Sequence, residues 1–183
     1  MLLQYETRRL VLKILGPDYS YDVLRFYERD KELFEKYESD RSQNFYTEAH
    51  QRTILQLEYG LCLKFHHIRF YVFLKEDPAT IIGTVCLYEI SKPYARAELG
   101  YKFNSEYHHK GYASEAVEKL IDIAFTELNL HRLCAKVVED NTASIRLLQG
   151  LGFEQEGICR DYMCFHGVWT DHLQFSLLAP NIS

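Results

Sequence analysis

The segment from Glu106 to Val117 constrains this chain more than any other. A strand-like run over residues 98–103 leads into a short turn containing Gly111, and the turn opens directly into a helical pattern. The apolar positions that follow have the 3.6-residue spacing of a core-facing helix: Ala113, Ala116, Val117, Leu120, Ile121, Ala124, Phe125 and Leu128. The free N–H groups of a first helical turn point outward at the positive end of the helix dipole. The segment therefore predicts a strand–turn–helix unit whose turn can hold a phosphate group.

The composition is that of a globular chain. Its 183 residues are 47% hydrophobic and 26% charged, with no internal repeat, low-complexity tract or linker. We therefore expect a single domain spanning residues 1–183. No apolar run approaches the length of a membrane span, and the start of the chain has no signal-peptide pattern. These features predict a cytoplasmic protein with no membrane partner.

Cysteine, histidine and charge patterns exclude several classes of function. The five cysteines are scattered without a C-x-x-C pair, which predicts reduced thiols rather than a disulfide framework. The pairs His66–His67 and His108–His109 have no carboxylate or cysteine at ligand spacing, so no metal site is expected. A net charge of −5 without a long basic run argues against nucleic acid as a partner.

Hydrophobic periodicity predicts an α+β order of elements. The expected strands are 8–15, 68–74, 80–90, 97–103, 131–138, 153–165 and 170–178, and the expected helices are 19–37 (one or two), 47–65, 112–129 and 141–151. In the 47–65 helix the pattern places Ile54, Leu55, Leu57, Leu61 and Leu63 inside. The strand–helix–strand crossover should be right-handed and make strands 97–103 and 131–138 parallel.

Several motifs occur together in a characteristic order. They are Glu6–Lys13, Ala97–Tyr101, His108–Ala113, Asn141–Phe153 and Gly167–Asp171. Together they resemble the GNAT superfamily of N-acetyltransferases, in particular its RimJ/RimL-like branch of ribosomal-protein N-terminal acetyltransferases. The resemblance extends over nearly the whole chain. It implies a GNAT fold with flanking helices, in which a twisted, mostly antiparallel central sheet has two central strands that splay apart to admit acetyl-CoA.

The resemblance also implies which residues bind acetyl-CoA, the cosubstrate of this family. They are Tyr101, Lys102, Phe103, His108, His109, Lys110, Gly111, Tyr112, Ala113, Asn141 and Ser144. The family's turn pattern begins with Gln or Arg, where this chain has His108, and His109 stands where the branch often has glycine. An ordinary strand-to-helix turn that uses Gly111 for its geometry is the alternative interpretation.

Two residues are the candidates for catalysis. By the resemblance, Ser144 protonates the departing thiolate, because the tyrosine that many relatives carry four residues later is replaced by Leu148. Glu98 is the candidate base, taking a proton from an ammonium group directly or through water. The structural alternatives are that Asn141 (or Asp140) caps a helix with Ser144 in its first turn, and that Glu98 pairs with Arg96 or with a neighbouring strand. We expect Asp171 to make a structural bond to a neighbouring strand.

The function implied is direct transfer of an acetyl group from acetyl-CoA to a primary amine, first of all a protein N-terminal α-amine. An α-amino group with a pKa near 8 is neutral in about a tenth of molecules at pH 7, whereas a lysine is neutral in roughly a few per ten thousand. A small amine, such as a polyamine, amino sugar or amino-acid analogue, is the alternative acceptor. Two other functions remain open: a non-catalytic CoA-binding regulatory module and a binding protein for another nucleotide. The chain could also form a homo-oligomer.

Overall fold

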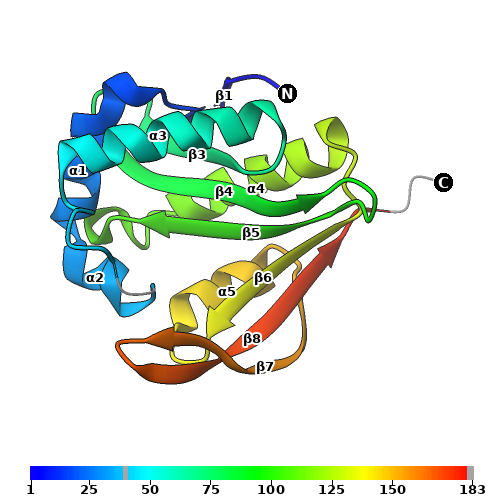
Figure 1. Ribbon diagram of the computed structural model, residues 1–183. Coiled ribbons are helices and arrows are strands. Elements are labelled where there is room, and N and C mark those ends of the chain that lie inside the picture. Colours follow the sequence, from blue (N-terminus) through cyan, green and yellow to red (C-terminus); the bar gives the residue numbers. More distant parts are fainter. Residues whose placement is uncertain (39–40, 181–183) are drawn as a thin grey trace.

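The computed structural model describes residues 1–38 and 41–180 (Figure 1). The described residues form an eight-stranded sheet in the order β1-β2-β3-β4-β5-β6-β8-β7. Neighbouring strands are antiparallel except for β5 (Arg96–Phe103) and β6 (Arg132–Val138), which are parallel as the crossover predicted. A mostly antiparallel sheet with helices on both faces confirms the predicted fold class.

The chain begins with two short antiparallel strands, β1 (Gln4–Glu6) and β2 (Leu10–Lys13). The prediction of one strand over residues 8–15 was therefore wrong at its start. Thr7 closes a turn here, since its N–H donates to the carbonyl of Leu10 at 3.0 Å. The turn brings Thr7 and Arg9 toward the helix that follows β5.

One face of the sheet is covered by α1 (Ser20–Arg29) and α3 (Glu48–Leu63), with the short α2 (Lys31–Lys36) beside them (Figure 1). These helices pack on β3 (Ile68–Leu74) and β4 (Ile81–Ser91). Leu55 of α3 is fully buried in this core, but Leu57 and Leu63 are 57% and 60% exposed. The prediction that these two leucines lie inside was wrong. Leu57 is two residues beyond Leu55, about 200° further around the helix, so it faces solvent.

The opposite face is covered by α4 (Tyr112–Asp122) and α5 (Thr142–Gly150). Buried Ala116, Val117 and Leu120 of α4 belong to the same core as Leu133 of β6. The helix predicted to reach residue 129 ends in a π-helical turn, Ile123–Glu127, where the N–H of Leu128 donates to the carbonyl of Ile123 at 3.1 Å. The apolar stripe seen in the sequence is thus the core face of α4.

The parallel pair of strands opens soon after it begins. Strands β5 and β6 are paired only where Arg96–Glu98 lies beside Arg132–Cys134. Figure 1 shows the two ribbons diverging beyond that point. The predicted splay of the two central strands is confirmed. Backbone groups of residues 99–103 and 135–138 are therefore released from pairing with each other at the middle of the sheet.

The chain ends in a hairpin of β7 (Glu154–Phe165) and β8 (Val168–Leu178). Its turn, His166–Gly167, has positive φ at both residues, +50° and +80°, as a tight two-residue hairpin requires. The expected structural bond of Asp171 is present, because its Oδ1 accepts from the N–H of Asp161 at 2.8 Å. All five cysteines are free. No helix within the described ranges is both long and apolar enough to cross a membrane.

Candidate active site

A cleft of about 700 Å³ occupies the opening between β5 and β6. Its lining comes from α2, β4, β5, the turn before α4, α4 itself, β6, α5 and β8. All the residues predicted from the sequence line it except Glu98 and Lys110. The structure therefore brings motifs that lie far apart in the chain to one cavity, with the turn before α4 at the end that opens on the face of α4 and α5, and α2 at the end that opens on the face of α1 and α3.

The turn before α4 has the shape of an anion cradle. Gly111 is its N-terminal cap and lies in the left-handed region at φ +77°, a conformation that only glycine adopts without steric cost. His109 is also left-handed, at φ +59°. The first residues of α4, Tyr112–Ser114, line the cleft, so the N–H groups that lack partners within the helix lie at its wall. The positive end of the helix dipole favours an anion there.

His108 is folded back onto the preceding strand. Its Nε2 lies 2.9 Å from the carbonyl oxygen of Phe103. A carbonyl only accepts, so Nε2 carries the hydrogen of this bond. The imidazole thereby ties the turn to the end of β5.

Arg9 supports the turn from behind, a role that the sequence analysis missed. Its Nη1 donates to the carbonyl of Lys110 at 2.9 Å, and its Nε pairs with Glu115 of α4 at 2.7 Å. The guanidinium also lies 4.5 Å from the ring centroid of Tyr112. A Cβ added to Gly111 would come within 3.3 Å of Arg9 Nη2, so the turn and this side chain fit closely.

Glu115 is the anchor of this arrangement. One carboxylate oxygen accepts from the hydroxyl of Thr7 at 2.6 Å and from the N–H of Arg9 at 2.8 Å. Burial works to raise the pKa of Glu115, but the bonds from Thr7 and Arg9 and the charge of Arg9 outweigh it and lower the pKa. The carboxylate thus remains ionised in the first turn of α4, where the helix dipole stabilises it.

Asn141 and Ser144 lie together at the start of α5. The Asn141 side chain caps the helix by accepting from the N–H of Ser144 at 3.2 Å, so the predicted cap is confirmed. Tyr101 crosses the cleft from β5, and its hydroxyl donates to the carbonyl of Ser144 at 3.2 Å. Burial raises the pKa of Tyr101 to about 12, which keeps the hydroxyl protonated. Leu148 is fully buried, so a core side chain stands where many relatives carry tyrosine.

Glu98 makes the ion pair with a neighbouring strand that the sequence left as an alternative. Its Oε1 lies 2.8 Å from Nζ of Lys136 on β6, and both side chains are 13% exposed. Burial works to lower the pKa of Lys136, but Glu98 outweighs it and the pKa is raised. The second carboxylate oxygen, Oε2, is buried and has no hydrogen-bond partner. The catalytic role of Glu98 stays a prediction.

The other end of the cleft is lined by polar side chains that the sequence analysis did not single out. They are Glu38, Tyr88, Lys136 and His172. Strand register pairs Tyr88 with Glu98 and Val138 with His172. Lys136 stands between buried Ala135 and Val137 in the sequence. A charged residue between two apolar strand residues was the sequence signal that could have marked Lys136 as a site residue.

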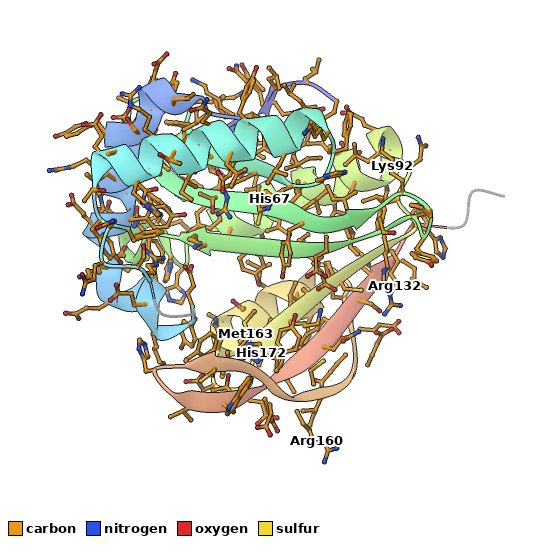
Figure 2. The ribbon with its side chains drawn as sticks, viewed as in Figure 1. His67, Lys92, Arg132, Arg160, Met163 and His172 are labelled. Carbon is orange, nitrogen blue, oxygen red and sulfur yellow. The ribbon has the colours of Figure 1, made fainter. Side chains whose placement is uncertain are left out.

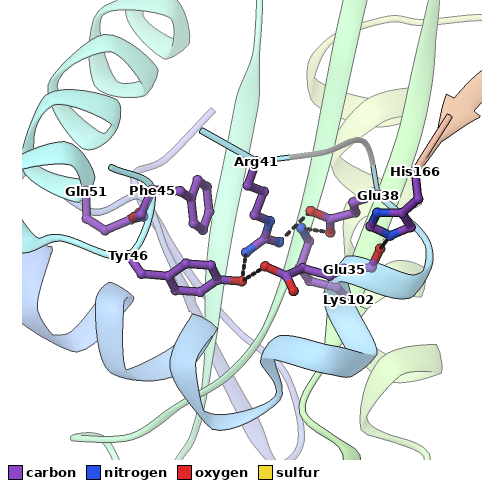
Figure 3. Close-up of polar contacts among 8 residues, drawn as sticks. All are labelled: Glu35, Glu38, Arg41, Phe45, Tyr46, Gln51, Lys102 and His166. Carbon is purple, nitrogen blue, oxygen red and sulfur yellow. Dashed lines mark hydrogen bonds and ion pairs between the residues drawn. The ribbon is translucent and has the colours of Figure 1, made fainter. Parts of the chain in front are cut away.

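A cluster at this end joins α2 to β5 and to the start of α3 (Figure 3). Glu38 pairs with Lys102, and its other oxygen accepts from Arg41 at 2.6 Å. The Arg41 side chain is only 6% exposed, stacks 4.0 Å from the ring centroid of Phe45 and donates to the Tyr46 hydroxyl at 3.0 Å. Burial works to raise the pKa of Glu38, but the two cations outweigh it and lower the pKa.

Lys102 was predicted to bind the cofactor. It lines the cleft, but its ammonium group is already paired with Glu38. Figure 3 also shows His166, at the tip of the β7–β8 hairpin, reaching the carbonyl of Glu35 at the end of α2. The final hairpin and the early helices thus enclose this end of the cleft together. Along residues 1–38 and 41–180, no group of three or more His, Cys, Asp or Glu is placed to hold a metal.

Residues 9–154 match the family model described as the acetyltransferase (GNAT) domain. The chain belongs to the GNAT family. The enzyme is an acetyl-CoA-dependent N-acetyltransferase: acetyl-CoA is its cosubstrate, and an amine is its acceptor. The cleft between the splayed strands, with a helix N-terminus at its wall, fits a cosubstrate that carries a diphosphate.

The relatives agree with this assignment. An uncharacterized N-acetyltransferase, p20 of Bacillus licheniformis, is 44% identical over 127 residues, which are 69% of this chain and 71% of that protein. The [ribosomal protein uS5]-alanine N-acetyltransferase of Escherichia coli is 27% identical over 180 residues, covering 96% and 90% of the two chains. The solved structure of ribosomal-protein-S5-alanine acetyltransferase from Vibrio fischeri is 28% identical, with a TM-score of 0.90 over 97% of each chain.

Proposed function

We propose that this enzyme acetylates the α-amine of a protein N-terminus, as ribosomal-protein acetyltransferases do. The support that carries this proposal is the extent of the agreement with the two ribosomal-protein S5 (uS5) alanine acetyltransferases. It covers 96% and 97% of this chain, whereas the family model ends at residue 154. The agreement therefore includes the β7–β8 hairpin, which lines the cleft through His172. We place the acceptor at this end of the cleft and call it the acceptor end.

In this proposal the donor is held mainly by backbone groups. The amides of residues 108–113 receive the diphosphate, and Asn141 bonds the pantetheine arm between β5 and β6. Arg9 and Glu115 hold the turn in place without touching the ligand. Such positioning of two reactants can supply a large part of the rate enhancement, since it replaces an encounter in solution by a fixed geometry.

The predicted catalytic pair completes the reaction. Glu98 does not line the cleft, so in this proposal its unpartnered Oε2 draws the proton of the acceptor's ammonium group through water. The amine nitrogen then forms a bond to the carbonyl carbon of the thioester, the C–S bond breaks, and its electron pair leaves with the sulfur. Ser144 gives that sulfur a proton. An α-amine requires only a modest base, because roughly a tenth of it is neutral at pH 7.

A panel of three matched acceptors tests the proposal. The first is an alanine-initiated peptide without lysine, the second is the same peptide with its α-amine blocked and one lysine added, and the third is spermidine. We expect thiol release and a mass increase of one acetyl group with the first peptide only. Preference for spermidine or for the lysine peptide would contradict the proposal.

Two further outcomes would identify the remaining alternatives. Binding of CoA without thiol release from any acceptor would indicate a regulatory CoA-binding module. Stronger thermal stabilisation by ATP or NAD than by CoA would indicate a different nucleotide as the ligand.

A further inference from the structure

His172 is a buried imidazole in the wall of the cleft, and Figure 2 labels its side chain. It is 4% exposed, and it lies on β8. Its Nδ1 is 3.2 Å from the carbonyl oxygen of Thr170. Since a carbonyl only accepts, Nδ1 must carry the hydrogen of this bond. In the neutral ring, Nε2 then holds the lone pair and is the nitrogen that can accept a proton.

The surroundings of His172 keep it neutral at pH 7. Burial lowers its pKa, and the ammonium group of Lys136 on β6 lowers it further, against the raising effects of the Thr170 bond and of Asp171. Tyr162 of β7 lies against it with ring centroids 5.1 Å apart, and Phe165 lies at 5.7 Å. The carboxylate of Asp171 is itself occupied by the N–H of Asp161.

His172 and Glu98 share one environment through Lys136. Lys136 pairs with Glu98 at 2.8 Å and lies 5.1 Å from the ring centroid of Tyr162, the residue that packs on His172. One oxygen of Glu98 is thus taken by a cation, and the other is free. One oxygen of Glu98 stays occupied by the Lys136 ammonium group, whereas Nε2 of His172 has its lone pair available to accept a proton.

We infer that His172 is a second catalytic residue, whose Nε2 takes up the proton that Glu98 first draws from the acceptor's ammonium group. Two protons leave the nitrogen as the amide forms. One passes to His172, which becomes an imidazolium and later releases it to solvent, and the other restores the Ser144 hydroxyl after that hydroxyl has protonated the thiolate. The inference rests on the proposed role of Glu98 but not on which amine is the acceptor.

The dependence of kcat/KM on pH tests this role. An acceptor that binds as its ammonium form adds no slope at low pH, whereas a base on the free enzyme adds one unit of slope below its own pKa. We expect a slope of 1 below the pKa of His172 in the unaltered enzyme and no slope over the same pH range in His172→Gln. At pH 7 kcat/KM should fall by about 100-fold, the lower range for loss of a general base, with an unchanged KM for acetyl-CoA.

His67→Gln is the matched control. His67 is also a histidine whose pKa is lowered by burial, but it does not line the cleft, so its variant should keep both the rate and the slope of 1. A uniform loss of activity in His172→Gln with an unaltered slope would overturn the inference, because it would indicate a structural role only.

A measurement on the unaltered protein covers the case in which His172→Gln does not fold. Nitrogen-15 NMR of the histidine rings at pH 7 should show His172 as the neutral tautomer protonated at Nδ1. An imidazolium, or the tautomer protonated at Nε2, would overturn the inference. The kinetic experiment uses whichever amine the enzyme acetylates and the NMR experiment uses none, so a failure of the peptide proposal would not be confused with a failure of this one.

Discussion

The two ends of the cleft are built in different ways. The end proposed to hold the cofactor is one continuous segment, residues 108–113, and its proposed role depends on backbone shape and on the first N–H groups of α4. The end proposed to hold the acceptor is assembled from single side chains of α2, β4, β6 and β8, and the flanking Glu98 comes from β5. The first can tolerate changes of side chain provided that the backbone keeps its path. The second depends on the chemistry of each group.

The largest expected effect is at the acceptor end. Glu98→Gln should lower kcat/KM for the amine by about 100-fold, because an amide can still meet Lys136 but cannot draw a proton. The KM for acetyl-CoA should not change. Steady-state kinetics with Glu89→Gln, an exposed carboxylate of β4, as the control would check this. Full activity in Glu98→Gln would remove this residue from the mechanism.

At the cofactor end, Gly111→Ala should act through the backbone. A non-glycine residue at φ +77° costs about 1–2 kcal/mol, and the new Cβ would lie 3.3 Å from Arg9 Nη2. We expect the KM for acetyl-CoA to rise by about 10-fold with little change in kcat at saturation. Gly60→Ala, where a Cβ meets nothing within 4 Å, is the matched control. Equal KM values in the two variants would contradict a shape-dependent cradle.

Loss of the Arg9 contacts that hold the cradle in place should have a smaller effect. Arg9→Ala removes the bond to the Lys110 carbonyl and the pair with Glu115, so the turn loses its fixed position. The KM for acetyl-CoA should rise by about five-fold, since a hydrogen bond contributes about 1 kcal/mol. The neighbouring exposed Arg8→Ala should leave it unchanged. If both variants behaved alike, the specific role of Arg9 would be lost.

The smallest effect concerns stability against acid. The pKa of Glu115 is lowered in the folded protein, so its contribution to the free energy of unfolding is present above pH 4.5 and is lost as the pH falls through the lowered value. Glu115→Gln should therefore unfold at a temperature a few degrees lower at pH 7, with a smaller difference at pH 3.5. Thermal unfolding at the two pH values measures this. A constant difference would show that the charge of Glu115 is not involved.

The same contrast explains what the sequence could predict. The cradle and α4 were visible because Gly111 and the apolar stripe are contiguous, and the cap formed by Asn141 is a local pattern. The start of the first strand was misplaced because the turn at Thr7 is specified by side-chain bonds to Glu115 of α4, far along the chain. Leu57 was placed inside because periodicity alone does not show how wide the buried face of a helix is.

The acceptor end could not be assembled from local patterns. Glu38, Lys136 and His172 belong to elements separated by many residues, and only strand pairing and the packing of α2 bring them together. A lone histidine in a strand carries no signal of its role until its neighbours are known. The structure supplies those neighbours, Thr170 for Nδ1 and Lys136 for its charge.

A crystal structure with coenzyme A bound is the most direct test of the division between the two ends. The diphosphate should accept hydrogen bonds from main-chain amides of residues 108–113, and the thiol should lie between Ser144 and Glu98. A diphosphate held elsewhere by side chains, with that turn unliganded, would contradict the account.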